Sequence, residues 1–92
     1  MILEVKFTNS FKNDLKLVKR QNKNLNKLLI VIEKIANYHK LEEMYHDHPW
    51  LGEYSGTREC HIEPDWLLIY EIIEEKNVLI LYRTGSHSKL FR

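Results

Sequence analysis

The hydrophobic pattern of the chain begins with an alternation, because residues 3–7 read LEVKF. A period of two predicts a strand with one buried side. From Phe11 to about Arg20, apolar residues recur at spacings of three and four, after a TNS segment whose side-chain oxygens suit a helix N-cap. A second and longer stripe of this kind runs from Leu25 to Ala36, beyond the polar link QNKN. Because the link is short, the two segments predict a helical hairpin.

The stretch 38–56 shows no period, and we predict that it is an ordered loop. Residues 58–63 alternate again. Cys60 and Ile62 fall on one side of this predicted strand, and the other side holds three polar residues, namely Glu59, His61 and Glu63.

Two further strands are predicted after the Pro64-Asp65 pair, from the segments WLLIYEII and NVLILYRT around the charged turn EEKN. The C-terminal segment GSHSKLFR is predicted to be a short end piece of the chain, beyond the last strand. The order β-α-α-β-β-β predicts one α+β domain over residues 1–92, with the N-terminal strand and the helical hairpin packed on an antiparallel sheet. We expect the helices to cover one face of the sheet and to leave the other face for function.

Length and composition narrow the class of protein. A chain of 92 residues with 43% hydrophobic and 29% charged residues suits a single soluble globular domain. Its apolar runs are too short to span a bilayer, and its first residues lack the pattern of a secretory signal, so we expect neither a membrane segment nor export. Cys60 is the only cysteine, which excludes an internal disulfide and fits a reducing, cytoplasmic setting.

Charge is unevenly distributed along the chain. Residues 1–40 hold nine Lys or Arg against three acids, a balance of +6, and residues 41–92 hold five against ten, a balance of −5. Within the basic half, lysines recur at helical spacing opposite the apolar stripe: Lys12, Lys16, Lys19, Lys23 and Lys27. A solvated helix face explains such a row, and the row also suits the phosphates of RNA.

The histidines are the clearest candidates for catalytic residues. His48, His61 and His87 each lie beside a predicted strand or its end, where Asp65 could join them. Cleavage of RNA by its own 2′-hydroxyl needs one group to remove a proton and a second to protonate the departing 5′-oxygen. Histidine suits both steps, because its ordinary pKa is about 6.5.

The same reaction needs a cation beside the charged phosphorane. The guanidinium of Arg83 or Arg58 could donate two hydrogen bonds to phosphate oxygens. Asp65 could orient an imidazole or take the proton itself.

Other interpretations of these residues stay open. The spacing of His46 and His48 permits a metal site, but such pairs are common by chance, and we predict neither a metal nor another cofactor. A single histidine is more often a surface residue than a catalyst, and Trp66 within an apolar strand is more often core. The residues alone therefore predict an RNA-binding or RNA-cleaving domain.

Three segments carry a resemblance to a known family: DHPWLG at 47–52, RECHIEPDWLLIY at 58–70 and RTGSHSKLF at 83–91. Together they resemble the YafQ-like branch of the RelE/ParE superfamily, the toxins of bacterial type II toxin-antitoxin modules. The resemblance covers nearly the whole chain and implies a RelE-like fold. It also implies a ribosome-dependent endoribonuclease that cuts translated mRNA and is neutralised by a cognate antitoxin, a ribbon-helix-helix DNA-binding protein.

The resemblance places the active site of the family on six residues: His48, His61, Asp65, Trp66, His87 and Phe91. Our hypothesis for these residues is that His87 is the general acid and that the base is one of Asp65, His61 and His48. Arg83 would hold the phosphate, and Trp66 and Phe91 would hold or stack the splayed base.

The chain departs from the family between Gly52 and Arg58, where relatives often read W-K-G-Y and this sequence has Tyr54, Ser55, Gly56 and Thr57. A lysine is therefore absent, which weakens the expected contacts with the ribosome or substrate. Two alternatives stay open. One is a non-catalytic ParE-like toxin that targets gyrase, and the other is an RNA-binding module neutralised by an antitoxin.

Overall fold

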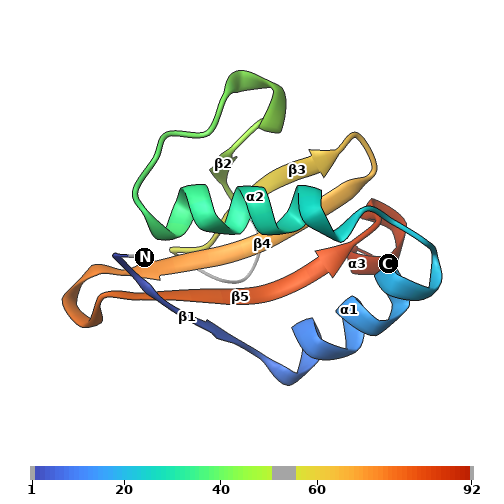
Figure 1. The fold of residues 1–92 in the computed structure, drawn as a ribbon, viewed down its shortest axis with the longest axis horizontal. Coiled ribbons are helices and arrows are strands. Elements are labelled where there is room, and N and C mark those ends of the chain that lie inside the picture. Colours follow the sequence, from blue (N-terminus) through green and yellow to red (C-terminus); the bar gives the residue numbers. More distant parts are fainter. Residues whose placement is uncertain (1, 51–55, 92) are drawn as a thin grey trace.

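The structure is a computed structural model and describes residues 2–50 and 56–91. Its helices and strands follow one another along the chain as shown in Figure 1: β1 (Glu4–Phe7), α1 (Asn9–Arg20), α2 (Leu25–Ala36), the 3-10 turn η1 (Glu43–Tyr45), β2 (His48–Pro49), β3 (Arg58–Glu63), β4 (Trp66–Ile73), the 3-10 turn η2 (Glu74–Lys76), β5 (Val78–Gly85) and α3 (His87–Leu90).

The predicted α+β class and the succession of a strand, two helices and three strands are confirmed. The five strands lie in the order β1-β5-β4-β3-β2. All neighbours are antiparallel except β1, which pairs in parallel with β5 through a register that sets Glu4 against Val78. The expectation of a wholly antiparallel sheet is therefore corrected at this edge, because alternation gives the period of a strand and not its partner.

Both predicted helices begin where the sequence offers a capping side chain. Thr8 accepts a hydrogen bond from the Phe11 N–H, and Asn24 accepts one from the Asn26 N–H. These caps satisfy backbone donors that the first turn of a helix leaves unpaired. The predicted loop 38–56 contains η1 and β2 within its described part, and the end piece forms the short helix α3.

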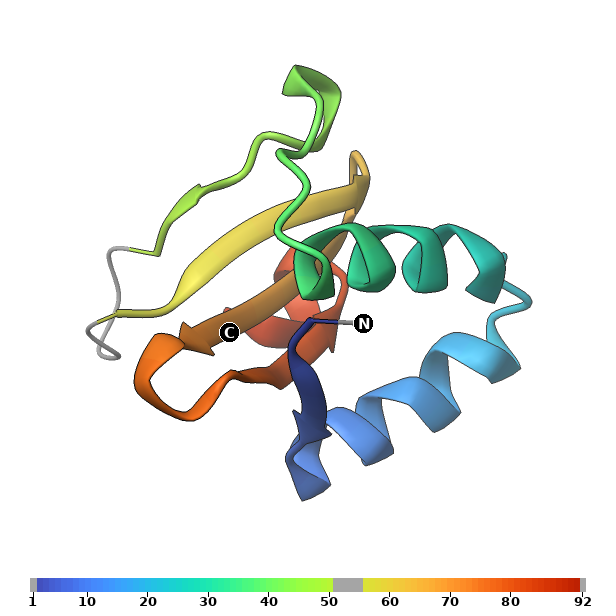
Figure 2. The ribbon, with the colours of Figure 1, turned by 60° about the vertical axis from the view of Figure 1, so that its left-hand side comes forward.

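The helical hairpin covers one face of the sheet, with α2 running across β3 and β4 and α1 lying against β5 (Figures 1 and 2). The core between the layers is apolar, with Trp66, Leu68 and Leu81 at most 2% exposed. The opposite face, which we expect to be left for function, also holds buried apolar residues, namely Leu67 and Ile69. Within the described part of the chain, no helix is long and apolar enough to cross a membrane.

Candidate active site

A row of polar side chains crosses the outer strands on the face opposite the helical hairpin. His48 of β2 pairs with Glu59 of β3, and His61 follows two residues later on the same side of β3. Glu59 is only 7% exposed. Its Oε1 lies 3.8 Å from Nε2 of His48 and 3.6 Å from Nε2 of His61. One buried carboxylate thus faces two imidazoles.

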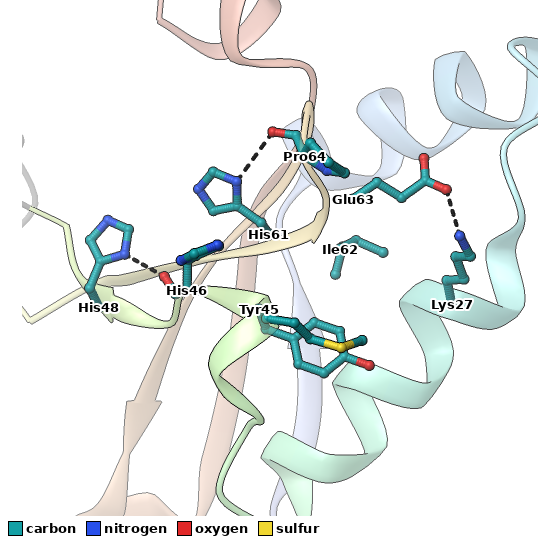
Figure 3. A pocket seen from close by; sticks show the side chains of 9 residues that line it. Lys27, Tyr45, His46, His48, His61, Ile62, Glu63 and Pro64 are labelled. Atoms are coloured by element: carbon teal, nitrogen blue, oxygen red, sulfur yellow. Dashed lines mark hydrogen bonds and ion pairs between the residues drawn. The ribbon is translucent and has the colours of Figure 1, made fainter.

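His46 adds a third imidazole to this cluster. Its backbone is left-handed, with φ 49°, at the point where η1 ends. Its ring meets that of His61 edge to face at 5.5 Å between centroids, and its carbonyl oxygen lies against Nδ1 of His48 (Figure 3). The rings of His48 and His61 are 6.5 Å apart. The three rings line an open pocket of about 750 Å³, together with Lys27, Met44, Tyr45, Ile62, Glu63 and Pro64.

Asp65 and His87 meet at the other end of the β3–β4 turn. Oδ1 of Asp65 accepts a hydrogen bond of 3.1 Å from the backbone N–H of His87, at the start of α3. The same turn contacts the histidine cluster, because Nδ1 of His61 lies 3.3 Å from the carbonyl oxygen of Pro64 (Figure 3). The turn therefore contacts the His61 imidazole through Pro64 and the backbone of His87 through Asp65.

An aromatic row extends from His87 along α3. The ring of Phe91 lies 4.7 Å from that of His87 and 5.7 Å from that of Trp50. Phe91 is only partly buried. The predicted position of Phe91 beside His87 therefore agrees with the structure, and its predicted contact with a base stays a prediction.

The two arginines predicted to hold phosphate are both engaged with carboxylates. Arg83 donates from Nε and Nη2 to Asp14 of α1, at 2.6 and 3.0 Å. Arg58 donates to Asp47, at 3.3 Å from both Nε and Nη2. Arg58 also alternates with Glu59 and shares a side of β3 with buried Cys60, so it projects away from the histidine cluster.

Trp66 does not present a ring to substrate. Its side chain is fully buried, and Nε1 donates a hydrogen bond of 2.9 Å to Oγ1 of Thr84. A fully buried indole with a satisfied N–H is a core residue. The predicted stacking of Trp66 on a base therefore does not fit this geometry, and the core interpretation does.

Glu59 and His46 were missed as site residues by sequence reasoning. The alternation of residues 58–63 already placed Glu59 beside His61, so a signal for it existed. His46 lies in a stretch without a period, and its left-handed backbone has no sequence signal of its own. Tyr54 and Ser55, where the chain departs from its relatives, lie outside the described residues, as do Leu51 and Gly52 of the DHPWLG segment.

Neither the histidine cluster nor any other group of three or more His, Cys, Asp or Glu has an arrangement fit to hold a metal ion, within residues 2–50 and 56–91.

A family profile described as "Bacterial toxin of type II toxin-antitoxin system, YafQ" matches residues 3–92. The chain belongs to the YafQ toxin family. The mRNA interferase toxin YafQ of Escherichia coli K12 is 35% identical over 89 residues, which cover 96% of this chain and 95% of that protein. The putative toxin YafQ of Haemophilus influenzae is 33% identical over 92 residues, at 95% and 90% coverage.

Solved structures of YafQ proteins confirm the RelE-like fold. The chain is similar to the E. coli DinJ-YafQ toxin-antitoxin complex with a TM-score of 0.89, at 33% identity and full coverage of both chains. It is also similar to a metal-bound toxin from Helicobacter pylori, with a TM-score of 0.92 at 39% identity, over 97% of this chain and 99% of that one.

Proposed function

We propose that this YafQ-family toxin is a ribosome-dependent endoribonuclease that cleaves translated mRNA in the cytoplasm. The observation that carries the proposal is the convergence of His48 and His61 on Glu59, with the His46 ring against that of His61 and with Asp65 bonded to the backbone of His87 at the neighbouring turn. The name of the E. coli relative, an mRNA interferase, supports the same activity.

The proposed chemistry is metal-independent acid-base catalysis. One of Asp65, His61 and His48 removes the proton of the ribose 2′-hydroxyl, whose oxygen forms a bond to phosphorus as the bond to the 5′-oxygen breaks. His87 gives its proton to the departing 5′-oxygen. Oε1 of Glu59 lies 3.6 to 3.8 Å from Nε2 of each neighbouring imidazole, so a buried negative charge stands beside groups proposed to transfer protons.

Substrate contacts divide between phosphate and base. Arg83 is the proposed phosphate ligand, since Asp14 fixes its guanidinium while 36% of the side chain is exposed. Phe91 is the proposed base contact, since its ring lies beside His87. Lys12, Lys16 and Lys19 of α1 supply positive charge for ribosomal RNA, whereas Lys23 and Lys27 of the predicted row pair with Glu63.

We infer that a cognate antitoxin, a small ribbon-helix-helix protein, neutralises the toxin. The DinJ-YafQ complexes are the supporting observation. A non-catalytic ParE-like action on gyrase is less well supported, because it requires no imidazole cluster. Binding to RNA without cleavage would likewise leave the pairing of Glu59 with two histidines without a purpose.

The test is expression without an antitoxin, followed by mapping of new 5′ ends on cellular mRNA. We expect ribosome-dependent cuts that disappear in His87→Ala and persist in His39→Ala, a matched control whose exposed histidine lies outside the site. In assays with EDTA-treated, magnesium-restored ribosomes the cuts should persist, which would separate this toxin from one that needs a transition metal. Gyrase-linked DNA damage with intact mRNA would contradict the proposal.

A further inference from the structure

A second polar cluster lies on the side of β3 opposite the histidines. Asp47 stands between His46 and His48 in the chain, yet its carboxylate accepts hydrogen bonds from groups on the opposite side of the sheet. The Tyr70 hydroxyl donates to Oδ1 at 2.6 Å, and Arg58 donates from Nε to Oδ1 and from Nη2 to Oδ2 at 3.3 Å. Tyr70 is 2% exposed, so the contact is anchored in the core.

Among the described residues, the segment that carries His46 and His48 pairs with the sheet over a short length. β2 is two residues long and pairs with β3 only at His48 and Pro49. Pro49 has no N–H to donate to the ladder. The next backbone bond runs from the Trp50 N–H to the carbonyl oxygen of Thr57, at 3.0 Å. Two residues before β2 begins, the backbone of His46 is left-handed, which lies outside the β region that strand pairing requires.

We propose that Asp47, Arg58 and Tyr70 are positioning residues that hold the segment of His46 and His48 over His61. Arg58 then acts on the reaction through Asp47 and not by contact with substrate phosphate. This inference rests on the proposed function for its effect on catalysis, whereas its structural part holds whether or not the toxin cleaves RNA.

The electrostatics of the cluster agree with a fixed anchor. Burial raises the pKa of Tyr70 far above its ordinary value, and the hydrogen bond and charge of Asp47 raise it further. Burial opposes the charge of Arg58, but the hydrogen bond and charge of Asp47 outweigh it, so the pKa of Arg58 is also raised. Neither Arg58 nor Tyr70 therefore loses its proton near neutral pH, so both remain hydrogen-bond donors to Asp47.

The first test compares Tyr70→Phe with Tyr82→Phe. Each removes one hydroxyl that donates to a carboxylate, to Asp47 in the first case and to Glu71, at 2.7 Å, in the second. We expect Tyr70→Phe to lower kcat about tenfold with an unchanged KM, since small misplacement of catalytic groups reduces rate more than binding. Tyr82→Phe should leave both constants unchanged.

Proton NMR of the free toxin separates positioning from general stability and from catalysis. Nuclear Overhauser contacts between the ring protons of His46 and His61 should weaken or vanish in Tyr70→Phe and persist in Tyr82→Phe. Persistence of these contacts in both variants would overturn the positioning role. If wild-type toxin cleaved no RNA, the proposed function would fail, and the NMR comparison would still decide the role of the cluster.

A double-mutant cycle with Asp47→Asn and Arg58→Gln tests how Arg58 acts. If Arg58 works through Asp47, the double variant should lose no more activity than the more impaired single variant, because contacting residues are not additive. If Arg58 binds phosphate itself, the two losses should multiply, and this result would overturn the proposed path through Asp47. Melting temperatures of all four proteins identify any loss caused by unfolding.

Discussion

Each side of β3 holds a carboxylate, and the two carboxylates have different neighbours. On the helix side, Asp47 accepts three hydrogen bonds from Arg58 and Tyr70, at 2.6 to 3.3 Å. On the other side, Glu59 faces the Nε2 atoms of His48 and His61 at 3.8 and 3.6 Å, which is longer than a direct hydrogen bond. Glu59 is nevertheless the more buried of the two, with a side chain 9% exposed against 26% for Asp47.

This difference separates a structural carboxylate from one suited to chemistry. Arginine stays charged in proteins, so its pair with Asp47 has one protonation state. Imidazole gains and loses a proton near neutrality, so the charge next to Glu59 can change during a reaction. Glu59 thus places a buried negative charge beside side chains that can transfer protons.

The largest effect is expected when an imidazole is removed from the side of β3 that holds Glu59 and the proposed catalytic histidines. His61→Ala should reduce cleavage by about 10²- to 10⁴-fold, the range for loss of a general acid or base. Its side chain is 24% exposed and packs little core, so the melting temperature should change little. Single-turnover cleavage of ribosome-bound mRNA measures the first effect, and thermal unfolding the second. A loss below threefold would remove His61 from the reaction.

Glu59→Gln tests the carboxylate itself. The amide keeps the shape and removes the charge, so we expect a loss of cleavage of about 10- to 100-fold with the fold intact, equivalent to about 1.4 to 2.8 kcal/mol. Ribosome binding should be unaffected, since Glu59 is buried. Comparison with Glu42→Gln, an exposed carboxylate paired with Lys34, provides the control. Equal activity in the two variants would show that the buried charge next to the histidines does not assist cleavage.

Sequence patterns predicted the helices and the three long strands because their periods are set by which side is buried. The alternation of residues 58–62 separated the two sides of β3 correctly, with Arg58 beside Cys60 and Glu59 beside His61. The predicted placement of Glu63 with His61 is wrong, because a β-bulge between these two residues sets Glu63 against Trp66, and its carboxylate pairs with Lys23 and Lys27 of the helical hairpin. The same alternation places Arg58 on the Cys60 side of β3, away from His61, and its predicted contact with phosphate stays a prediction.

Other features depend on tertiary contacts that no local pattern reports. The parallel pairing of β1 with β5 is determined by where the helical hairpin returns the chain. The ion pair of Arg83 with Asp14 joins residues 69 positions apart. Asp14 also accepts a hydrogen bond from the N–H of Thr84, in the part of β5 that extends beyond its pairing with β1. Such pairs need the folded arrangement of α1 on the sheet before they can be recognised.

Cys60→Ser should affect stability and leave the chemistry of the other side alone. The thiol is fully buried between residues of the core, and a hydroxyl there without a partner costs about 1 to 3 kcal/mol. Burial raises the pKa of the Cys60 thiol far above its ordinary value, and the charges of Asp47 and Glu59 raise it further. The folded wild type should therefore resist alkylation at pH 8. Urea unfolding and thiol labelling measure these effects, and fast labelling of folded protein would contradict the assigned burial.

The smallest effect is expected for Tyr82→Phe at alkaline pH. The hydrogen bond to Glu71, with some burial, raises the pKa of Tyr82 from 10.0 to about 12. The folded state therefore binds this proton more tightly than the unfolded state, and the stabilisation is complete below pH 10 and lost as the pH rises to 12. The free energy of unfolding of wild type relative to Tyr82→Phe, from urea curves, should thus fall between pH 9 and pH 12. Tyr70 is present in both proteins, so its own titration cancels from the difference. A difference that stayed constant over this range would show that the Tyr82 hydroxyl is not bound to Glu71 in solution.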